Sequence, residues 1–226
     1  MKKIVIVGDG ETAELAYEYL THDSSSEVAA FSVEKAYRKK SEMFGLPVVD
    51  FEEIERRYPP ADCDVFVAIS YTQLNRVRTR LYQQAKKKGY QFVSYVSSRA
   101  FVWRNVEIGE NCFIMENNVL QYAVRIGNNV VLWSGNHIGH QTVIKDNVFI
   151  SSHVVISGYC EIGENCFLGV NSSIANNIKI AKDCLIGMGA VVNRDTLERK
   201  VYVGNPARSR DADSFRVFGV DDEETR

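Results

Sequence analysis

The sequence has neither a large excess of one charge nor a long apolar run, and both absences limit what it can be. Its 226 residues include 27 basic and 29 acidic side chains, so no basic excess points to nucleic acid. The first apolar stretch ends at Gly8 and Asp9, which is too short for a signal peptide or a membrane span. With 45% hydrophobic residues, the composition predicts a soluble chain of one or two domains. We expect a cytoplasmic protein without membrane insertion.

Cysteine is scarce, and its positions argue against metal or disulfide chemistry. Four of the five cysteines, Cys112, Cys160, Cys166 and Cys184, fall on the small inward position of a six-residue repeat. We therefore interpret them as core residues rather than as ligands or disulfide partners. Cys63 precedes a predicted strand and is interpreted as structural too, so no metal site is predicted.

A six-residue period dominates the second half of the chain. Every sixth residue from Val102 to Val192 is Val, Ile or Leu without a break, and a fixed short period of this kind is typical of a solenoid. The dipeptides that begin at 108, 126, 144, 162 and 180 recur every eighteen residues, so one coil has three sides. One aliphatic and one small residue in every six matches the signature of the left-handed parallel β-helix.

The same period predicts where the coils turn. Asn or Gly stands three residues after many of the periodic positions, and both tolerate the left-handed backbone conformation of a tight corner. Stacked coils lie about 4.8 Å apart, so residue n is expected to lie over residue n+18. These predicted corner residues are Asn111, Asn117, Asn129, Gly135, Asn147, Asn165, Asn171, Asn177 and Gly189.

The first hundred residues follow a different, alternating pattern. Apolar runs predict strands and amphipathic runs predict helices, and their alternation indicates a parallel α/β sheet. The strands are expected at 2–8, 27–35, 47–51, 63–70 and 91–97, and the helices at 14–24 and 72–89. The basic residues of the second helix are typical of a solvated face, although such a cluster can also attract a diphosphate.

The chain therefore divides into three predicted parts. A small Rossmann-like domain is expected over 1–98, and a β-helix domain over 99–208. A C-terminal tail over 209–226 is expected to cap the last coil, since the open end of a solenoid must be covered.

The turn after the first predicted strand, GDGETA, indicates a phosphate-binding site. Gly8, Gly10 and Ala13 fit the GxGxxG/A form, in which glycines let a phosphate approach the N-terminus of a helix. Glu34, at the end of the second strand, can hold a ribose hydroxyl, and ligands bind at the carboxyl ends of parallel strands. Five strands are few for a dinucleotide fold, so a mononucleotide or nucleotide sugar is favoured over NAD. The candidate substrate-binding residues are Gly8, Asp9, Gly10, Glu11, Glu34, Lys35 and Ser70.

Three of the four histidines lie in one window of the solenoid. His137 should point outward, and His140 should lie near a corner with Gly158 one coil later. His153 stacks nearer Gly135, so the three imidazoles are not expected to converge within one chain.

Two asparagines stand in the same window where other coils have a small or aliphatic inward residue. Asn118 and Asn136 are eighteen residues apart, so they should stack and satisfy each other's hydrogen bonds. A role for Asn136 in positioning an active-site turn is an equal alternative.

Together these motifs resemble a known family. The GDGETAE turn, the unbroken hexapeptides, the segment NHIGHQTVIKDNVFIS, the ISG at 156–158 and the closing GMGAVV and VYVGNPAR are similar to bacterial sugar O/N-acyltransferases. These are the sialic acid O-acetyltransferases and the bacillosamine-type N-acetyltransferases. The resemblance implies a homotrimer, acetyl-CoA between neighbouring β-helices, and a nucleotide-linked sugar on the N-terminal domain.

The resemblance also assigns roles to individual residues. His140 matches the catalytic base, which takes a proton from a sugar amine or hydroxyl as it attacks the thioester. The backbone N–H of Gly158 matches the donor to the oxyanion. The residues implied to contact acetyl-CoA are Gly158, Phe149, Val170 and Met188.

The sequence departs from the family pattern at two positions. Gln141 stands where an acidic residue normally follows the histidine, and Phe149 replaces a second histidine. A glutamine can orient an imidazole but cannot stabilise its charged form, so Asn136 or a carboxylate of a neighbouring subunit is a candidate replacement.

Other functions fit the same solenoid. The main alternative is O-acetylation of sialic acid or of a polysaccharide sugar, because fold analogy cannot separate O- from N-transfer. A non-catalytic binding or scaffold protein and a zinc enzyme of the γ-carbonic anhydrase type are the others, although the histidine spacing differs from that of the zinc enzymes.

Overall fold

The N-terminal domain is built on a mainly parallel sheet with β1 at its centre. The computed structural model describes residues 2–221. The strand order is β3-β4-β2-β1-β5, in which only the short β3 is antiparallel to its neighbour. The strands are β1 (Lys3–Val7), β2 (Val28–Val33), β3 (Glu42–Met43), β4 (Leu46–Asp50) and β5 (Cys63–Val67). The predicted α/β domain is confirmed, and β3 is an edge strand that the sequence pattern did not predict.

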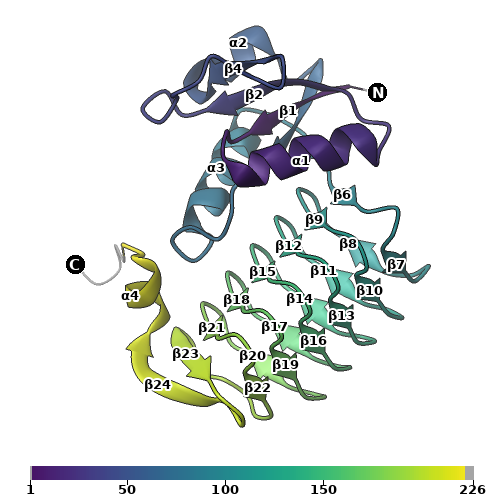
Figure 1. Ribbon diagram of the computed structural model, residues 1–226, viewed down its shortest axis with the longest axis vertical. Helices are drawn as coiled ribbons and strands as arrows, with labels where there is room; N and C mark the ends of the chain where they lie inside the picture. The colour runs from purple at the N-terminus through teal and green to yellow at the C-terminus, as the bar shows by residue number, and fades with distance from the viewer. Residues whose placement is uncertain (1, 222–226) are drawn as a thin grey trace.

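Two helices cover opposite faces of this sheet because the side chains of β1 alternate (Figure 1). Ile4 and Ile6 pack in a cluster with Ala13, Ala16 and Leu20 of the first helix. Val5 and Val7 pack in a second cluster with the other long helix and with its connection to the β-helix. The helices are α1 (Glu11–His22), the short η1 (Phe51–Glu53) and α2 (Ile54–Arg57), and α3 (Arg76–Lys87).

The second domain is a left-handed β-helix of two-residue strands, as predicted. Each strand pairs in parallel with the strand eighteen residues away, for example Val119 with His137 and His137 with Val155. Three sheets result. The first has β6 (Tyr95–Val96), β9 (Phe113–Ile114), β12 (Val131–Leu132), β15 (Phe149–Ile150), β18 (Phe167–Leu168) and β21 (Leu185–Ile186). The second has β7 (Phe101–Val102), β10 (Val119–Leu120), β13 (His137–Ile138), β16 (Val155–Ile156), β19 (Ser173–Ile174) and β22 (Val191–Val192). The third has β8 (Glu107–Ile108), β11 (Arg125–Ile126), β14 (Val143–Ile144), β17 (Glu161–Ile162) and β20 (Lys179–Ile180).

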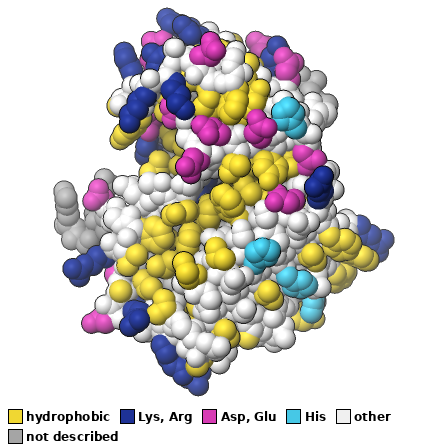
Figure 2. All heavy atoms as spheres, in the orientation of Figure 1, with side chains coloured by type: hydrophobic (Ala, Val, Ile, Leu, Met, Phe, Trp, Pro, Cys, Tyr) yellow, Lys and Arg dark blue, Asp and Glu magenta, His cyan; other side chains and the backbone are white. Residues whose placement is uncertain are grey.

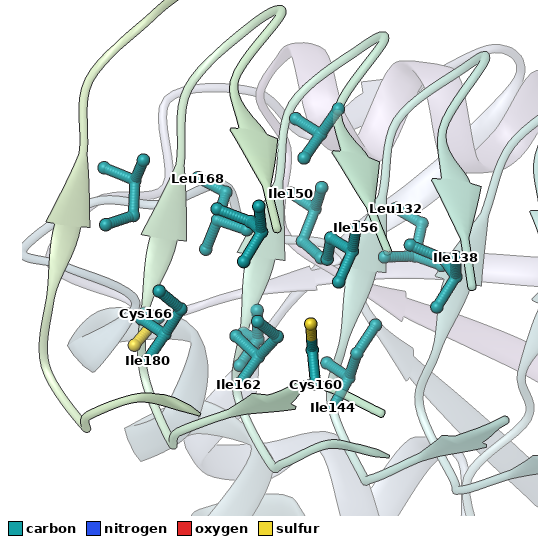
Figure 3. Close-up of a cluster of buried hydrophobic side chains, with 14 of the residues drawn as sticks. Leu132, Ile138, Ile144, Ile150, Ile156, Cys160, Ile162, Cys166, Leu168 and Ile180 are labelled. Atoms are coloured by element: carbon teal, nitrogen blue, oxygen red, sulfur yellow. The ribbon is translucent and has the colours of Figure 1, made fainter. Parts of the chain in front are cut away.

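From β9 to β22, the second residue of each two-residue strand points into the core of the coil. Figure 3 shows these side chains meeting from all three sheets, with Cys160 and Cys166 among the aliphatic residues. The four cysteines assigned to the inward position are buried and not in disulfides. Their interpretation as core residues is confirmed.

The corners adopt the left-handed conformation at every predicted position, with φ between 54° and 78°. Five other residues that follow the same spacing, Ala123, Gln141, His153, Tyr159 and Asp183, adopt it as well. We name two corner rows for use below. The asparagine corner joins the third sheet to the first and contains Asn111, Asn129, Asn147, Asn165 and Asp183. The histidine corner joins the second sheet to the third and contains Ala123, His140 with Gln141, Tyr159 and Asn177.

The junction between the domains differs from the prediction. The expected fifth strand of the N-terminal sheet, at 91–97, contributes only a single bridge there, between Val65 and Phe92. Its later part is β6, which pairs with β9 of the β-helix. The prediction of a fifth parallel strand was therefore wrong, because this segment leaves the sheet to begin the first coil.

The last coil is followed by an arm that folds back toward the N-terminal domain. β23 (Lys200–Val203) extends the first sheet in parallel, and β24 (Arg208–Asp213) adds to it antiparallel. α4 (Ser214–Phe218) then packs Phe218 against Phe167 and Tyr71. None of the helices within residues 2–221 has the length and apolarity needed to cross a bilayer.

Candidate active site

A cleft of about 820 Å³ separates the carboxyl ends of the N-terminal strands from the first sheet of the β-helix. Figure 2 shows a band of hydrophobic side chains along the β-helix here, facing acidic side chains on the N-terminal domain. This volume lies in the usual range for small-molecule sites. The lining residues are Gly8–Thr12, Leu15, Val33, Ala68–Thr72, Val77, Trp133, Phe149, Ser151, Ser152 and Val170.

The glycine turn lies at the wall of the cleft formed by the N-terminal domain. Gly8 has φ of 134°, and a Cβ there would lie 2.7 Å from the carbonyl oxygen of Ala68, so only glycine fits. Gly10 is the N-cap of α1, and no side chain caps that helix end. The first N–H groups of α1 have no acceptor within the helix, and the helix dipole favours an anion there. The turn can therefore hold a phosphate, as the sequence indicated.

The structure gathers most, but not all, of the candidate substrate residues. Gly8, Asp9, Gly10, Glu11 and Ser70 line the cleft.

Glu34 and Lys35 do not line the cleft. Both carboxylate oxygens of Glu34 accept hydrogen bonds from Arg80, at 2.7 and 2.9 Å. Lys35 is exposed, and its N–H donates to Glu52. The end of β2 is thus tied to α3 and to η1.

Aromatic rings form the opposite wall. Phe149 is the outward residue of β15, and it stacks on Phe167 with ring centroids 5.6 Å apart. Tyr71 meets both rings edge-on, and Trp133 lies beside Phe149. Among the residues implied to contact acetyl-CoA, Phe149 and Val170 line this cleft, whereas Met188 lies outside it and is 80% exposed.

His140 lies away from this cleft, at the histidine corner. Its imidazole rests on Gly158 of the next coil, where a Cβ would lie 2.6 Å from Cε1 and 2.7 Å from Nε2. The predicted stacking of these two residues is therefore present, and a side chain at 158 would collide with the ring. His140 is exposed, and its backbone N–H donates to Oε1 of Gln121.

The groups proposed to assist His140 have other partners or none. The Gly158 N–H donates to Oδ1 of Asn176 at 2.9 Å, so it must exchange that partner to meet an oxyanion. Within residues 2–221, no hydrogen bond joins the His140 imidazole to Gln141 or to any other group, and Gln141 is exposed.

Asn136 and Asn118 are both buried but do not pair with each other. The Nδ2 groups of both donate to the carbonyl oxygen of Trp133, and Oδ1 of Asn136 accepts from the Val154 N–H. The predicted mutual pairing was wrong, because the carbonyl of Trp133 lies between the two coils and accepts from both amides. The amides instead fix the turn that carries Trp133 at the cleft wall.

The remaining histidines occupy separate positions. His137 faces outward from the second sheet, and His153 lies over Gly135 at the corner between the first and second sheets. No group of three His, Cys, Asp or Glu side chains within the described residues could hold a metal ion.

Sequence reasoning missed the contacts that hold the cleft together. Arg78 is 1% exposed, and it donates to the carbonyl oxygens of Ser70 at 2.9 Å and of Asn147 at 3.0 Å. Further bonds reach the carbonyls of Asn129 and Val148. Burial lowers the pKa of Arg78 to about 9, so it remains charged at neutral pH. It joins a cleft loop directly to the β-helix.

The asparagine corner completes this junction. The side chain of Asn111 pairs with the backbone of Val67 in β5, and its Nδ2 also donates to Asn129, which donates to Asn147. Asn75, at the start of α3, donates to the carbonyl of Asn165 at 2.9 Å. The eighteen-residue spacing of these asparagines was a signal that one corner carries a continuous polar row.

Comparison with known proteins adds to this geometry. The profile of the bacterial transferase hexapeptide (six repeats) matches residues 105–136, 123–158 and 159–194. Sequence comparison with curated proteins gives no match.

Several solved structures share the whole fold. A histidine-to-asparagine variant of perosamine N-acetyltransferase from Caulobacter crescentus, in complex with CoA and GDP-perosamine, is 25% identical. It covers 94% of this chain and 98% of its own, with a TM-score of 0.85. The acetyltransferase domain of PglB from Neisseria gonorrhoeae FA1090 is 22% identical, covering 93% of this chain and 100% of its own, with a TM-score of 0.83. Both domains of the chain are therefore matched together.

Proposed function

Because the bacterial transferase hexapeptide profile matches residues 105–136, 123–158 and 159–194, we propose that the protein transfers an acetyl group from acetyl-CoA to the amine of a nucleotide-linked amino sugar. The main observation behind the proposal is that one structure, an N-acetyltransferase solved with CoA and GDP-perosamine, matches both domains together over 94% of the chain. The cleft between the two domains supplies a site of suitable size for the nucleotide sugar.

The nucleotide would bind in this cleft with its phosphates at the N-terminus of α1. Gly8 and Gly10 leave the backbone accessible there. No Lys or Arg lines the cleft within the described residues. The attraction for the phosphates must therefore come from backbone N–H groups and the helix dipole. Asp9 and Glu11 lie on the same wall and favour a substrate that also carries an ammonium group.

His140 is the candidate general base. Acetyl-CoA supplies an acyl group activated as a thioester. As the amine nitrogen attacks the thioester carbonyl carbon, the imidazole accepts the amine proton, and it returns a proton to the departing sulfur when the C–S bond breaks. The N–H of Gly158 is the candidate oxyanion donor, and Asn176 is the partner it would release.

A homotrimer would bring these groups together. Within one chain, His140 and the cleft lie at different edges of the triangular coil, separated by the second sheet. That sheet exposes Phe101 and Val155, 53% and 43% accessible, whereas the third sheet presents charged residues such as Arg125 and Lys179. We therefore propose the second sheet as the subunit interface, so that His140 of one subunit completes the cleft of its neighbour.

Acetyl-CoA would lie along the same interface. Val170 and Met188, 41% and 80% exposed, offer apolar surface for a pantetheine chain near the corner between the first and second sheets. Five free, buried cysteines suit a reducing compartment, and we propose that the protein acts in the cytoplasm.

A thiol-release assay tests the proposal. Acetyl-CoA is supplied with UDP-, dTDP- and GDP-linked 3- and 4-amino sugars and, separately, with sialic acid. Turnover on an amino sugar supports N-transfer and identifies the nucleotide. Turnover on sialic acid alone replaces the proposal with O-acetylation, and a protein that binds no CoA and releases no thiol is a scaffold instead.

A further inference from the structure

The histidine corner contains residues that its backbone conformation disfavours. Within residues 2–221, most left-handed corners of the coils have Asn, Asp or Gly, and four do not. Three of those four are Ala123, Gln141 and Tyr159, all on the histidine corner. A bulky side chain with positive φ is strained, and such strain is typically retained where it serves function.

Tyr159 has the largest side chain of these residues and contacts His140 directly. It has φ of 59°, and its ring lies edge-on to the imidazole, with centroids 4.9 Å apart and planes at 85°. Gly158 lies against the imidazole as well, with a would-be Cβ within 3.0 Å of three ring atoms. The imidazole is thus confined by backbone on one side and by the Tyr159 ring on another.

Within residues 2–221, the imidazole makes no hydrogen bond and no other ring contact. Gln141, at the position where an acidic residue would be expected, makes no hydrogen bond to the imidazole within the described residues. Edge-to-face packing is a preferred and directional geometry for aromatic rings. The ring of Tyr159 therefore restricts the rotamers of His140, which is the task an adjacent carboxylate would otherwise perform.

We propose that Tyr159 is a positioning residue that orients the His140 imidazole for proton transfer, an inference that rests on the proposed function of His140. The contact uses the ring rather than the hydroxyl. Glycine would relieve the backbone strain at this corner, so tyrosine is retained at a cost to stability.

Kinetics of three variants separate positioning from a structural role. Tyr159→Leu and Tyr159→Gly each remove the ring, and we expect kcat to fall about tenfold with the KM of both substrates unchanged, since misorientation affects the chemical step. Tyr159→Phe keeps the ring and is expected to restore most of kcat. Tyr159→Gly is also expected to retain or raise Tm, so that activity falls while stability does not. Tyr122→Leu, at an equally exposed tyrosine one coil before His140, is the matched control.

A spectroscopic measurement keeps the test independent of the acceptor sugar. With histidine labelled at Cε1, the His140 resonance in the wild-type protein should show a ring-current shift that is lost in Tyr159→Leu and kept in Tyr159→Phe. Unchanged resonances overturn the inference, whatever the substrate. Shifted resonances together with full activity of His140→Asn overturn the proposed role of His140 instead. Loss of activity that follows dissociation of the oligomer, measured by light scattering, assigns Tyr159 to the interface and also overturns the inference.

Discussion

The asparagine corner and the histidine corner have the same left-handed backbone and the same spacing, yet their side chains behave in opposite ways. Asn111, Asn129 and Asn147 form a continuous row of amide hydrogen bonds that ends on β5. On the histidine corner, His140 and Tyr159 are exposed, their rings contact each other, and the imidazole also lies against Gly158. The amides of the asparagine corner find their hydrogen-bond partners at the domain junction. The side chains of His140, the proposed catalytic base, and of Tyr159 remain exposed.

This difference shows that equivalent corners of one repeat can have different roles. The backbone sets the turn at each corner, so the side chains there are free to differ in role. Polar residues that find partners stabilise the junction, whereas those left without partners can serve a substrate or a neighbouring subunit. Single substitutions can change the side chains of one corner at a time, and the other corner then serves as the reference.

The largest effect is expected at the histidine corner. His140→Asn should lower kcat about 10³-fold, because general base catalysis typically contributes on that order. Its stability should change little, since the side chain is exposed. Stopped-flow or thiol-release kinetics and thermal unfolding measure both quantities. Full turnover in a folded variant would contradict the assignment.

The next effect is expected at the domain junction. Arg78→Met leaves the carbonyls of Ser70, Asn129 and Asn147 without a donor, and should lower the free energy of unfolding by about 3 kcal/mol. The KM for the nucleotide sugar should rise, because Ser70 lies on the cleft. Urea unfolding and steady-state kinetics measure these changes.

Arg80→Met is the matched control for Arg78. Arg80 lies on the same helix, but its ion pair with Glu34 is partly exposed. Such pairs contribute up to about 1 kcal/mol. Equal losses of unfolding free energy in the two variants would show that the burial of Arg78 adds nothing to stability.

A smaller effect is expected within the amide row. Asn129→Ala should cost about 1–2 kcal/mol more than Asn177→Ala. Both replacements lose a residue suited to positive φ, but only Asn129 exchanges side-chain hydrogen bonds with neighbouring coils. Equal costs, measured by urea unfolding, would show that the row adds nothing beyond the corner conformation.

The smallest effect is a gain in stability. Ala123 has φ of 56° on the histidine corner, and Ala123→Gly should stabilise the protein by about 0.5 kcal/mol through relief of strain. Differential scanning calorimetry measures the shift in Tm. A decrease in Tm would show that the Cβ of Ala123 makes a stabilising contact.

The sequence determined everything that depends on local pattern. The six-residue period predicted the inward residues, the three sides of the coil and the stacking of His140 on Gly158. Asn and Gly predicted the left-handed corners, and Gly8 predicted the tight turn at α1. Each follows from the chain's own geometry, because side-chain spacing and permitted φ values are properties of neighbouring residues.

Only the tertiary structure decided which polar groups meet. The basic run on α3 predicted a solvated face. In the structure, Arg78 is buried against the β-helix, and Arg80 donates a hydrogen bond to Glu34. The segment at 91–97 reads as a strand of the N-terminal sheet but begins the first coil, and Asn136 pairs with a carbonyl rather than with Asn118. The physical reason is the same in each case. A local pattern specifies the direction in which a side chain points, but its partner is set by whichever surface docks there, and that surface comes from residues far away in the sequence.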